Sequence, residues 1–67
     1  MSDDPSSLSA RRGSVLLEQG RYPDAEKFFR EALAGDPNDA YVLYQLAVCE
    51  LNQDRDAAAL ETIGRAT

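Results

Sequence analysis

The sequence predicts an all-α domain of four short antiparallel helices, and three observations support this fold class. Apolar residues recur every three or four positions in four successive segments, which is the spacing of one helix face. Glycine, proline and polar residues separate these segments by only about two to five positions, so neighbouring helices must run antiparallel. No segment shows sustained alternation of apolar and polar residues, and no hairpin dipeptide such as Asn-Gly occurs.

The first helix is expected to follow a disordered tail, residues 1–6, which is polar and has nothing to bury. Ser6 or Ser7 can cap this helix, which should run to about Gln19. Its hydrophobic face is irregular because two adjacent arginines interrupt it, and Arg12 is expected to reach solvent past an apolar stem. The apolar positions are Leu8, Ala10, Val15, Leu16 and Leu17.

The second helix, between Tyr22 and Pro37, has the most regular pattern. Pro23 suits its first turn, and Gly35 can end it in the left-handed conformation. Alanines on its hydrophobic face allow another helix to approach closely, and phenylalanines fill the space beside them. Flanking segments must therefore cover this face, which comprises Ala25, Phe28, Phe29, Ala32 and Leu33.

The third helix is apolar on most of its surface, which is typical of a helix enclosed by neighbours. Asn38 or Asp39 can cap it, and it should reach Leu51 or Asn52. Few residues on it are polar, and these are Gln45, Glu50 and Asn52.

The fourth helix is expected after a polar turn, with Asp54 or Asp56 as its cap. Gly64 weakens it by roughly 1 kcal/mol relative to alanine. Its buried positions should be Ala59, Leu60, Ile63 and Ala66. Leu60 and Ile63 are expected to keep an exposed flank, because no polar capping helix covers them.

The first helix pair recurs in the second after a shift of 34 residues. Identical residues fall at Leu17/Leu51, Gln19/Gln53, Arg21/Arg55, Ala25/Ala59 and Ala32/Ala66, and similar ones at Leu8/Val42, Gly13/Ala47, Val15/Cys49 and Phe29/Ile63. Repeat one also carries Gly20 and Tyr22 at its turn, the spacing Ala25-x3-Phe29, and a corner at Asp36-Pro37-Asn38. With this period and these motifs, the sequence resembles the tetratricopeptide repeat family over about residues 6–67.

This resemblance implies an α-α superhelix of two helix-turn-helix repeats. Repeat one should cover about residues 6–39 and repeat two about residues 40–67, so that residues 7–67 form one domain. Four departures from the family pattern occur: Ser9 in place of a large residue, Arg12 in place of a buried leucine, Asp54 in place of the turn glycine, and Glu50 where an aromatic residue is common.

The composition disfavours several classes of partner. The formal net charge is −5 and the isoelectric point is near 4.4, which argues against nucleic acid or an anionic membrane. No apolar run approaches the roughly 18–20 residues of a membrane span. The N-terminus lacks the basic and apolar regions of a signal peptide, so a cytoplasmic location with a reduced Cys49 is expected.

The residues offer little for catalysis. Cys49 has no histidine partner and should be a buried hydrophobic residue, and without histidine the usual zinc sets cannot form. Pairs of charged residues such as Glu26/Arg30 and Glu18/Asp24 are expected on the solvated surface. No phosphate-binding glycine loop or acidic metal loop occurs. We therefore expect no enzyme activity, no cofactor, no metal and no catalytic residue.

In the family that this sequence resembles, the first helix of each repeat lines a concave groove that takes peptides or partner helices. The resemblance implies a non-catalytic module for protein–protein interaction, with a partly apolar protein or peptide as ligand. Tyr41 and Tyr44 are candidate anchors there, although packing inside the protein is an equally good interpretation. The groove positions are Arg11, Ser14, Leu17, Glu18, Tyr41, Tyr44, Gln45, Val48, Leu51 and Asn52, with Ser7 and Ala10 beside them.

Two alternatives to this peptide-binding adaptor remain open. Two repeats are fewer than the three or so that an isolated stack needs. The chain could therefore be an assembly module that forms a homo-oligomer, or a terminal fragment of a longer repeat scaffold.

Overall fold

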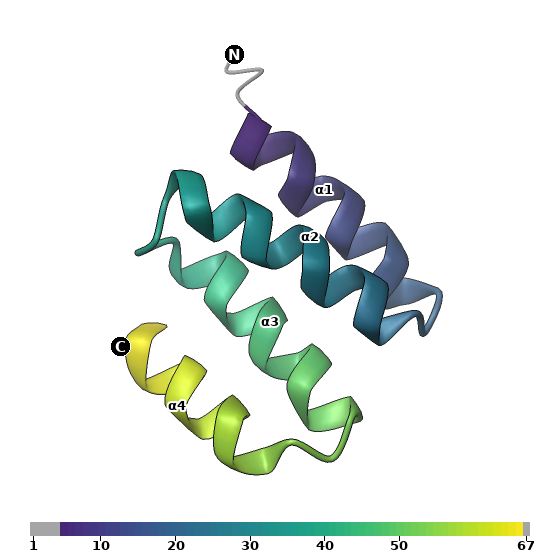
Figure 1. The fold of residues 1–67 in the computed structure, drawn as a ribbon, viewed down its shortest axis with the longest axis vertical. Helices are drawn as coiled ribbons and strands as arrows, with labels where there is room; N and C mark the ends of the chain where they lie inside the picture. Colours follow the sequence, from purple (N-terminus) through teal and green to yellow (C-terminus); the bar gives the residue numbers. More distant parts are fainter. Residues whose placement is uncertain (1–4, 67) are drawn as a thin grey trace.

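A computed structural model describes the backbone of residues 5–66 and the side chains of residues 8–66. Four helices make up this part of the chain: α1 (Pro5–Glu18), α2 (Tyr22–Gly35), α3 (Ala40–Asn52) and α4 (Asp56–Ala66). No strand occurs within residues 5–66. The predicted all-α fold of two helix-turn-helix repeats is confirmed (Figure 1).

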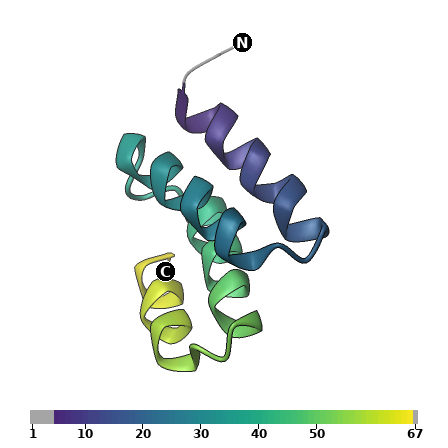
Figure 2. The same ribbon diagram turned by 45° about the vertical axis from the view of Figure 1, so that its right-hand side comes forward.

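The helices lie side by side in chain order, and the molecule is a flat body of 35 × 27 × 14 Å (Figures 1 and 2). Each helix packs against the next, and α1 also touches α3. Within residues 5–66, α4 touches only α3, and α1 touches α2 and α3, so the outer sides of α1 and α4 carry no helix. Repeat one and repeat two meet mainly through α2 and α3.

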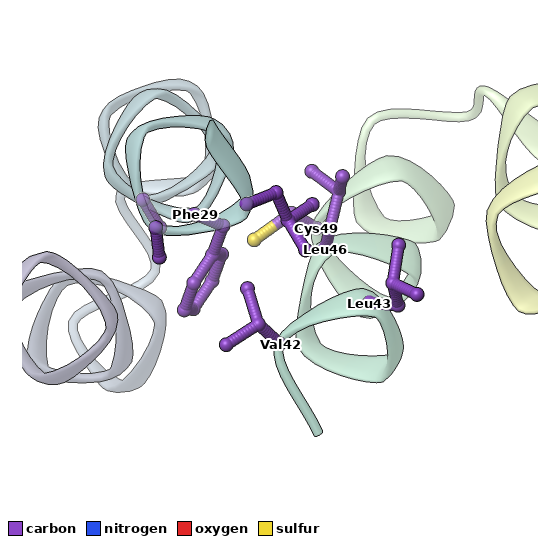
Figure 3. Packing of buried hydrophobic residues seen from close by; sticks show 8 residues of the cluster. Phe29, Val42, Leu43, Leu46 and Cys49 are labelled. Carbon is purple, nitrogen blue, oxygen red and sulfur yellow. The ribbon is translucent and has the colours of Figure 1, made fainter. Parts of the chain in front are cut away.

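The core lies between α2 and α3, where Phe29, Val42 and Cys49 meet (Figure 3). The helix-contact alanines are buried as expected: Ala25, Ala32 and Ala59 are at most 2% exposed. A Cβ atom at Gly13 would lie 2.6 Å from Cε1 of the Phe29 ring, so glycine is needed there to admit the ring. The other members of the core cluster are Leu33, Leu43 and Leu46.

Several helix boundaries differ from those predicted. α1 begins at Pro5, so neither Ser6 nor Ser7 caps it; proline is well suited to a first turn. Residues 1–4 of the predicted tail lie outside the described part of the chain. The prediction for α3 is confirmed at Asp39, whose Oδ1 accepts hydrogen bonds from the backbone N–H groups of Tyr41 and Val42 at 3.1 and 3.3 Å.

The prediction that Gly35 takes the left-handed conformation is wrong. α2 continues through Gly35, and the Asp36 N–H then donates to the Ala32 carbonyl. Within the described residues, positive φ occurs at Gly20 (75°) and at Asp54 (59°), the equivalent turn positions of the two repeats. Asp54 therefore belongs to the turn and does not cap α4.

Two predicted hydrophobic faces also need correction. Leu8 and Val15 are 46% and 53% exposed, because they point away from α2 and α3 towards the uncovered side of α1. Leu60 was expected among the buried positions of α4 but is 70% exposed, and Thr62 is buried instead. The expected exposed flank at Leu60 is therefore confirmed.

We predict that Asp54→Gly raises the free energy of unfolding by about 0.5–1 kcal/mol, because a left-handed backbone strains any residue with a Cβ atom. Urea unfolding followed by circular dichroism measures the change. Asp56→Gly is the matched control and should destabilise by a similar amount, because Asp56 lies in the first turn of α4. A loss of stability in both variants would contradict the strain at Asp54.

Candidate functional site

The predicted groove residues lie along α1 and α3, which contact one another. The interpretation in which the tyrosines pack inside the protein is wrong, since Tyr41 is 64% and Tyr44 is 61% exposed. Leu51 is 47% exposed on the same helix. Among the other predicted positions, Arg11, Glu18 and Asn52 are exposed, whereas Ser14, Leu17, Gln45 and Val48 are half-buried.

A chain of hydrogen bonds joins the two repeats across this surface, which we call the tyrosine face (the ten predicted groove residues). The Ser14 hydroxyl donates to Oε1 of Gln45 at 2.6 Å, and Nε2 of Gln45 donates to the Tyr41 hydroxyl oxygen at 2.8 Å. Because the Tyr41 oxygen acts as acceptor in this chain, its own proton is left to donate outward. The bonds thus hold α1 and α3 in register and orient one tyrosine.

A further polar group of the tyrosine face lies at the C-terminal end of α3. Nδ2 of Asn52 donates to the Val48 carbonyl on its own helix at 2.8 Å, which leaves the amide oxygen as an acceptor. Ala10 is half-buried beside α2, and the side chain of Ser7 lies outside the described residues. The face therefore offers exposed aromatic and aliphatic groups, with hydrogen-bonding groups at intervals.

A second polar cluster was missed by the sequence analysis and lies between α2, α3 and α4. Glu26 is buried, not on the solvated surface as predicted, and it accepts hydrogen bonds from three side chains. Arg55 Nη1 lies 3.0 and 3.1 Å from its two carboxylate oxygens, Arg30 Nη2 lies 2.7 Å from Oε2, and Gln53 Nε2 lies 2.9 Å from Oε1.

These contacts determine the ionisation of Glu26. Burial raises its pKa, but the hydrogen bonds from Arg30 and Gln53 and the charges of Arg30 and Arg55 outweigh burial, so the pKa lies below the usual 4.5. A carboxylate with a lowered folded-state pKa stabilises the fold at pH above its unfolded pKa. This contribution is lost as the pH falls through the folded pKa.

Glu50 is the second buried carboxylate of this cluster. The Thr62 hydroxyl donates to its Oε1 at 2.7 Å, and Arg30 Nη2 lies 3.8 Å from its Oε2. No buried side-chain nitrogen or oxygen among the described side chains lacks a hydrogen-bond partner. The cluster is thus internally satisfied and acts as a structural link between the two repeats.

Cys49 is buried next to this cluster, as predicted. Burial raises the pKa of its thiol to about 11, with further increases from the negative charges of Glu26 and Glu50. The group is therefore a thiol at neutral pH, whereas the nucleophilic form of cysteine is the thiolate. Among residues 8–66, no group of three histidine, cysteine, aspartate or glutamate side chains is arranged to hold a metal ion.

No helix between residues 5 and 66 is both long and apolar enough to cross a bilayer.

Comparison with known proteins gave one finding about identity. A family model described as tetratricopeptide repeat matches residues 16–67, which is most of the chain. Neither the curated proteins nor the solved structures gave a match.

Proposed function

Because the chain belongs to the tetratricopeptide repeat family, whose members generally mediate protein–protein interaction, we propose that it binds a partly apolar peptide or partner helix on the tyrosine face. Repeats of this family are typically non-catalytic scaffolds, and the internally paired carboxylates are consistent with such a role. The proposed ligand is a protein segment and not a nucleic acid, since the protein carries a net charge of −5.

The exposure of Tyr41 and Tyr44 carries this proposal. Most large apolar side chains of α3 are buried, yet these two rings and Leu51 are more than two-fifths exposed on one side of it. Tyrosine supplies a large apolar contact area and a hydroxyl group at low conformational entropy, which is why it is common at binding surfaces. The hydrogen bond from Gln45 orients the Tyr41 ring before any ligand arrives.

The test uses peptides selected on the wild-type protein from a random displayed library, because the natural ligand is unidentified. We expect Tyr41→Ala/Tyr44→Ala to weaken binding of the selected peptides by about 100-fold or more, as for paired aromatic anchors at a binding surface. Isothermal titration measures the affinity. The urea midpoint should change little, because both rings are exposed.

Leu60→Ala is the matched control, because Leu60 is equally exposed but lies on α4. It should leave peptide affinity unchanged. Selected peptides that bind the double tyrosine variant as tightly as the wild type would contradict the assignment of the site. Unfolding of that variant would show that the rings belong to the core.

A second function, self-association, is favoured by a separate observation. Leu8, Val15 and Leu60 are exposed on the two end helices of the row, α1 and α4.

A further inference from the structure

We propose that a second copy of this chain stacks end to end on the first, with α4 of one copy packed against α1 of the next. The contact would continue the α2–α3 junction that already joins the two repeats. The residues of that junction can be followed, through the internal shift of 34 residues, onto the uncovered ends of the molecule. The inference does not depend on the proposed peptide site.

The receiving surface is the outer side of α1. On α3, Val42 and Cys49 are buried against α2 (Figure 3), and their equivalents on α1 are Leu8 and Val15. These two residues remain apolar although they are about half exposed. The outer side of α1 thus keeps the apolar character of the junction without a helix to cover it.

The inserting surface is the outer side of α4. On α2, Glu26 and Phe29 face α3, and their equivalents on α4 are Leu60 and Ile63. Leu60 has the highest exposure of the large hydrophobic residues in the described part of the chain. A leucine at the position of a buried glutamate increases the apolar area available for burial at this end.

Both partners of an ion pair at the α2–α3 junction are replaced by uncharged residues at the equivalent positions of α4 and α1. In the ion pair between Arg30 and Glu50, the equivalent of Arg30 is Gly64 and the equivalent of Glu50 is Leu16. Both members are therefore uncharged at the free ends. Stacking would therefore bury no charged group at Leu16, so no ion pair is needed there.

At the second ion pair of the junction, only one of the two equivalent residues is charged, and it has a partner in its own repeat. Glu26 pairs with Arg55 inside the molecule, and the equivalent positions are Leu60 and Arg21. Arg21 obtains its counter-ion within its own repeat, from Asp24 at 2.9 Å, where repeat two has Ala58. An incoming Leu60 therefore leaves no guanidinium unpaired.

Two hollows on the surface show the same correspondence. One, of about 380 Å³, is lined by Leu16, Arg21, Asp24, Lys27, Phe28 and Glu31. The other, of about 210 Å³, is lined by the six residues that lie 34 positions further on, and also by Arg30 of the preceding repeat. The first hollow is thus the counterpart of a site that the preceding repeat helps to line, and a second copy would lie against it with Gly64 at the position of Arg30.

Arg12 is the one mismatch in this register. Its equivalent, Leu46, is buried, whereas Arg12 is exposed at the middle of the receiving surface. Its charge can reach solvent past its apolar stem, but the contact is weaker than with leucine.

The contact between copies is heterologous, so stacked copies form open chains and not closed dimers. The net charge of −5 on each copy opposes stacking, so added salt should strengthen it.

Sedimentation equilibrium over a range of concentrations tests the proposal. We expect the average mass of the wild-type protein to rise with concentration past that of a dimer. Val15→Arg and Leu60→Arg should each weaken association by about tenfold or more, because each would bury a charge without a partner. Arg12→Leu should strengthen it. Leu51→Arg, on the tyrosine face, is the matched control and should have no effect.

Mixing the two arginine variants gives the decisive result. Each variant has one intact end, so an equimolar mixture should form a dimer of one copy of each and grow no further. A mixture that stays monomeric while the wild-type protein forms dimers would indicate a symmetric contact and overturn the end-to-end arrangement. A wild-type protein that stays monomeric at millimolar concentration would overturn self-association itself. Circular dichroism verifies that each variant is folded.

Discussion

Phe29→Ala is expected to lower the free energy of unfolding by about 3–5 kcal/mol, the usual cost of emptying a buried phenylalanine site. A domain of 67 residues has a total stability of roughly 3–10 kcal/mol, so this loss takes a large part of the free energy of unfolding. The effect is large because the Phe29 ring is fully buried, packs against Gly13 and lies at the junction of the two repeats. Far-ultraviolet circular dichroism and urea titration measure it.

Phe28→Ala provides the comparison for this prediction. Phe28 precedes Phe29 on the same helix, but it is only half-buried and lines the open hollow on α1 and α2. Its truncation should therefore cost less than half as much. Equal losses of stability in the two variants would show that Phe29 does not occupy the centre of the core.

Thr62→Val is expected to lower the free energy of unfolding by about 1–3 kcal/mol, because it removes the hydroxyl that donates to the buried Glu50 carboxylate at 2.7 Å. The change keeps the shape of the side chain, so little packing is lost. The longer contact with Arg30, at 3.8 Å, would then be the remaining charged partner of that carboxylate among the described residues. Urea unfolding at neutral pH provides the measurement.

The double variant Glu50→Leu/Thr62→Val should recover most of this loss. Repeat one has the apolar residues Leu16 and Phe28 at the equivalent positions, and replacing a buried polar pair by apolar residues is often neutral or stabilising. Arg30 would still be paired with Glu26. If the double variant is no more stable than Thr62→Val alone, the hydrogen bond is not the source of the effect.

The fold could be predicted from the sequence because its main determinants are local. The spacing of Ala25, Phe29 and Ala32 is regular enough to define one helix face, and the same spacing recurs in repeat two. The enclosed position of α3 also follows from its composition, and Asp39 is a strong capping residue immediately before it. The tyrosine face followed from the family resemblance and not from the residue pattern alone, which left core and surface equally favoured for Tyr41.

The polar cluster could not be predicted, because it depends on contacts between residues distant in the sequence. Arg55 and Gln53 contact Glu26 from more than 25 positions away in the sequence, and no local pattern predicts such a contact. A lone glutamate on an amphipathic helix is usually solvated, so Glu26 was expected on the surface. One signal was present: Glu50 occupies the position of Leu16 in repeat one, which indicates a site facing the protein interior.

The first helix was harder to predict because apolar residues occur on several of its sides. Val15, Leu16 and Leu17 are consecutive, and only the position of neighbouring helices determines which of them is covered. The equivalence of Val15 with the buried Cys49 suggested burial, but no preceding repeat lies against α1 in the described structure. An internal repeat therefore identifies a packing surface without showing whether a neighbour covers it.

The most direct test of the account is a set of nuclear Overhauser contacts measured on the isotopically labelled wild-type protein. The central claim is that the two repeats pack through α2 and α3 around Phe29, with Tyr41 and Tyr44 outside. We predict contacts from the Phe29 ring to Gly13 and to methyl groups of α3, and none from either tyrosine ring to methyl groups of α2 or α4. Contacts between the tyrosine rings and those methyl groups, or a Phe29 ring without contacts to α1 and α3, would contradict it.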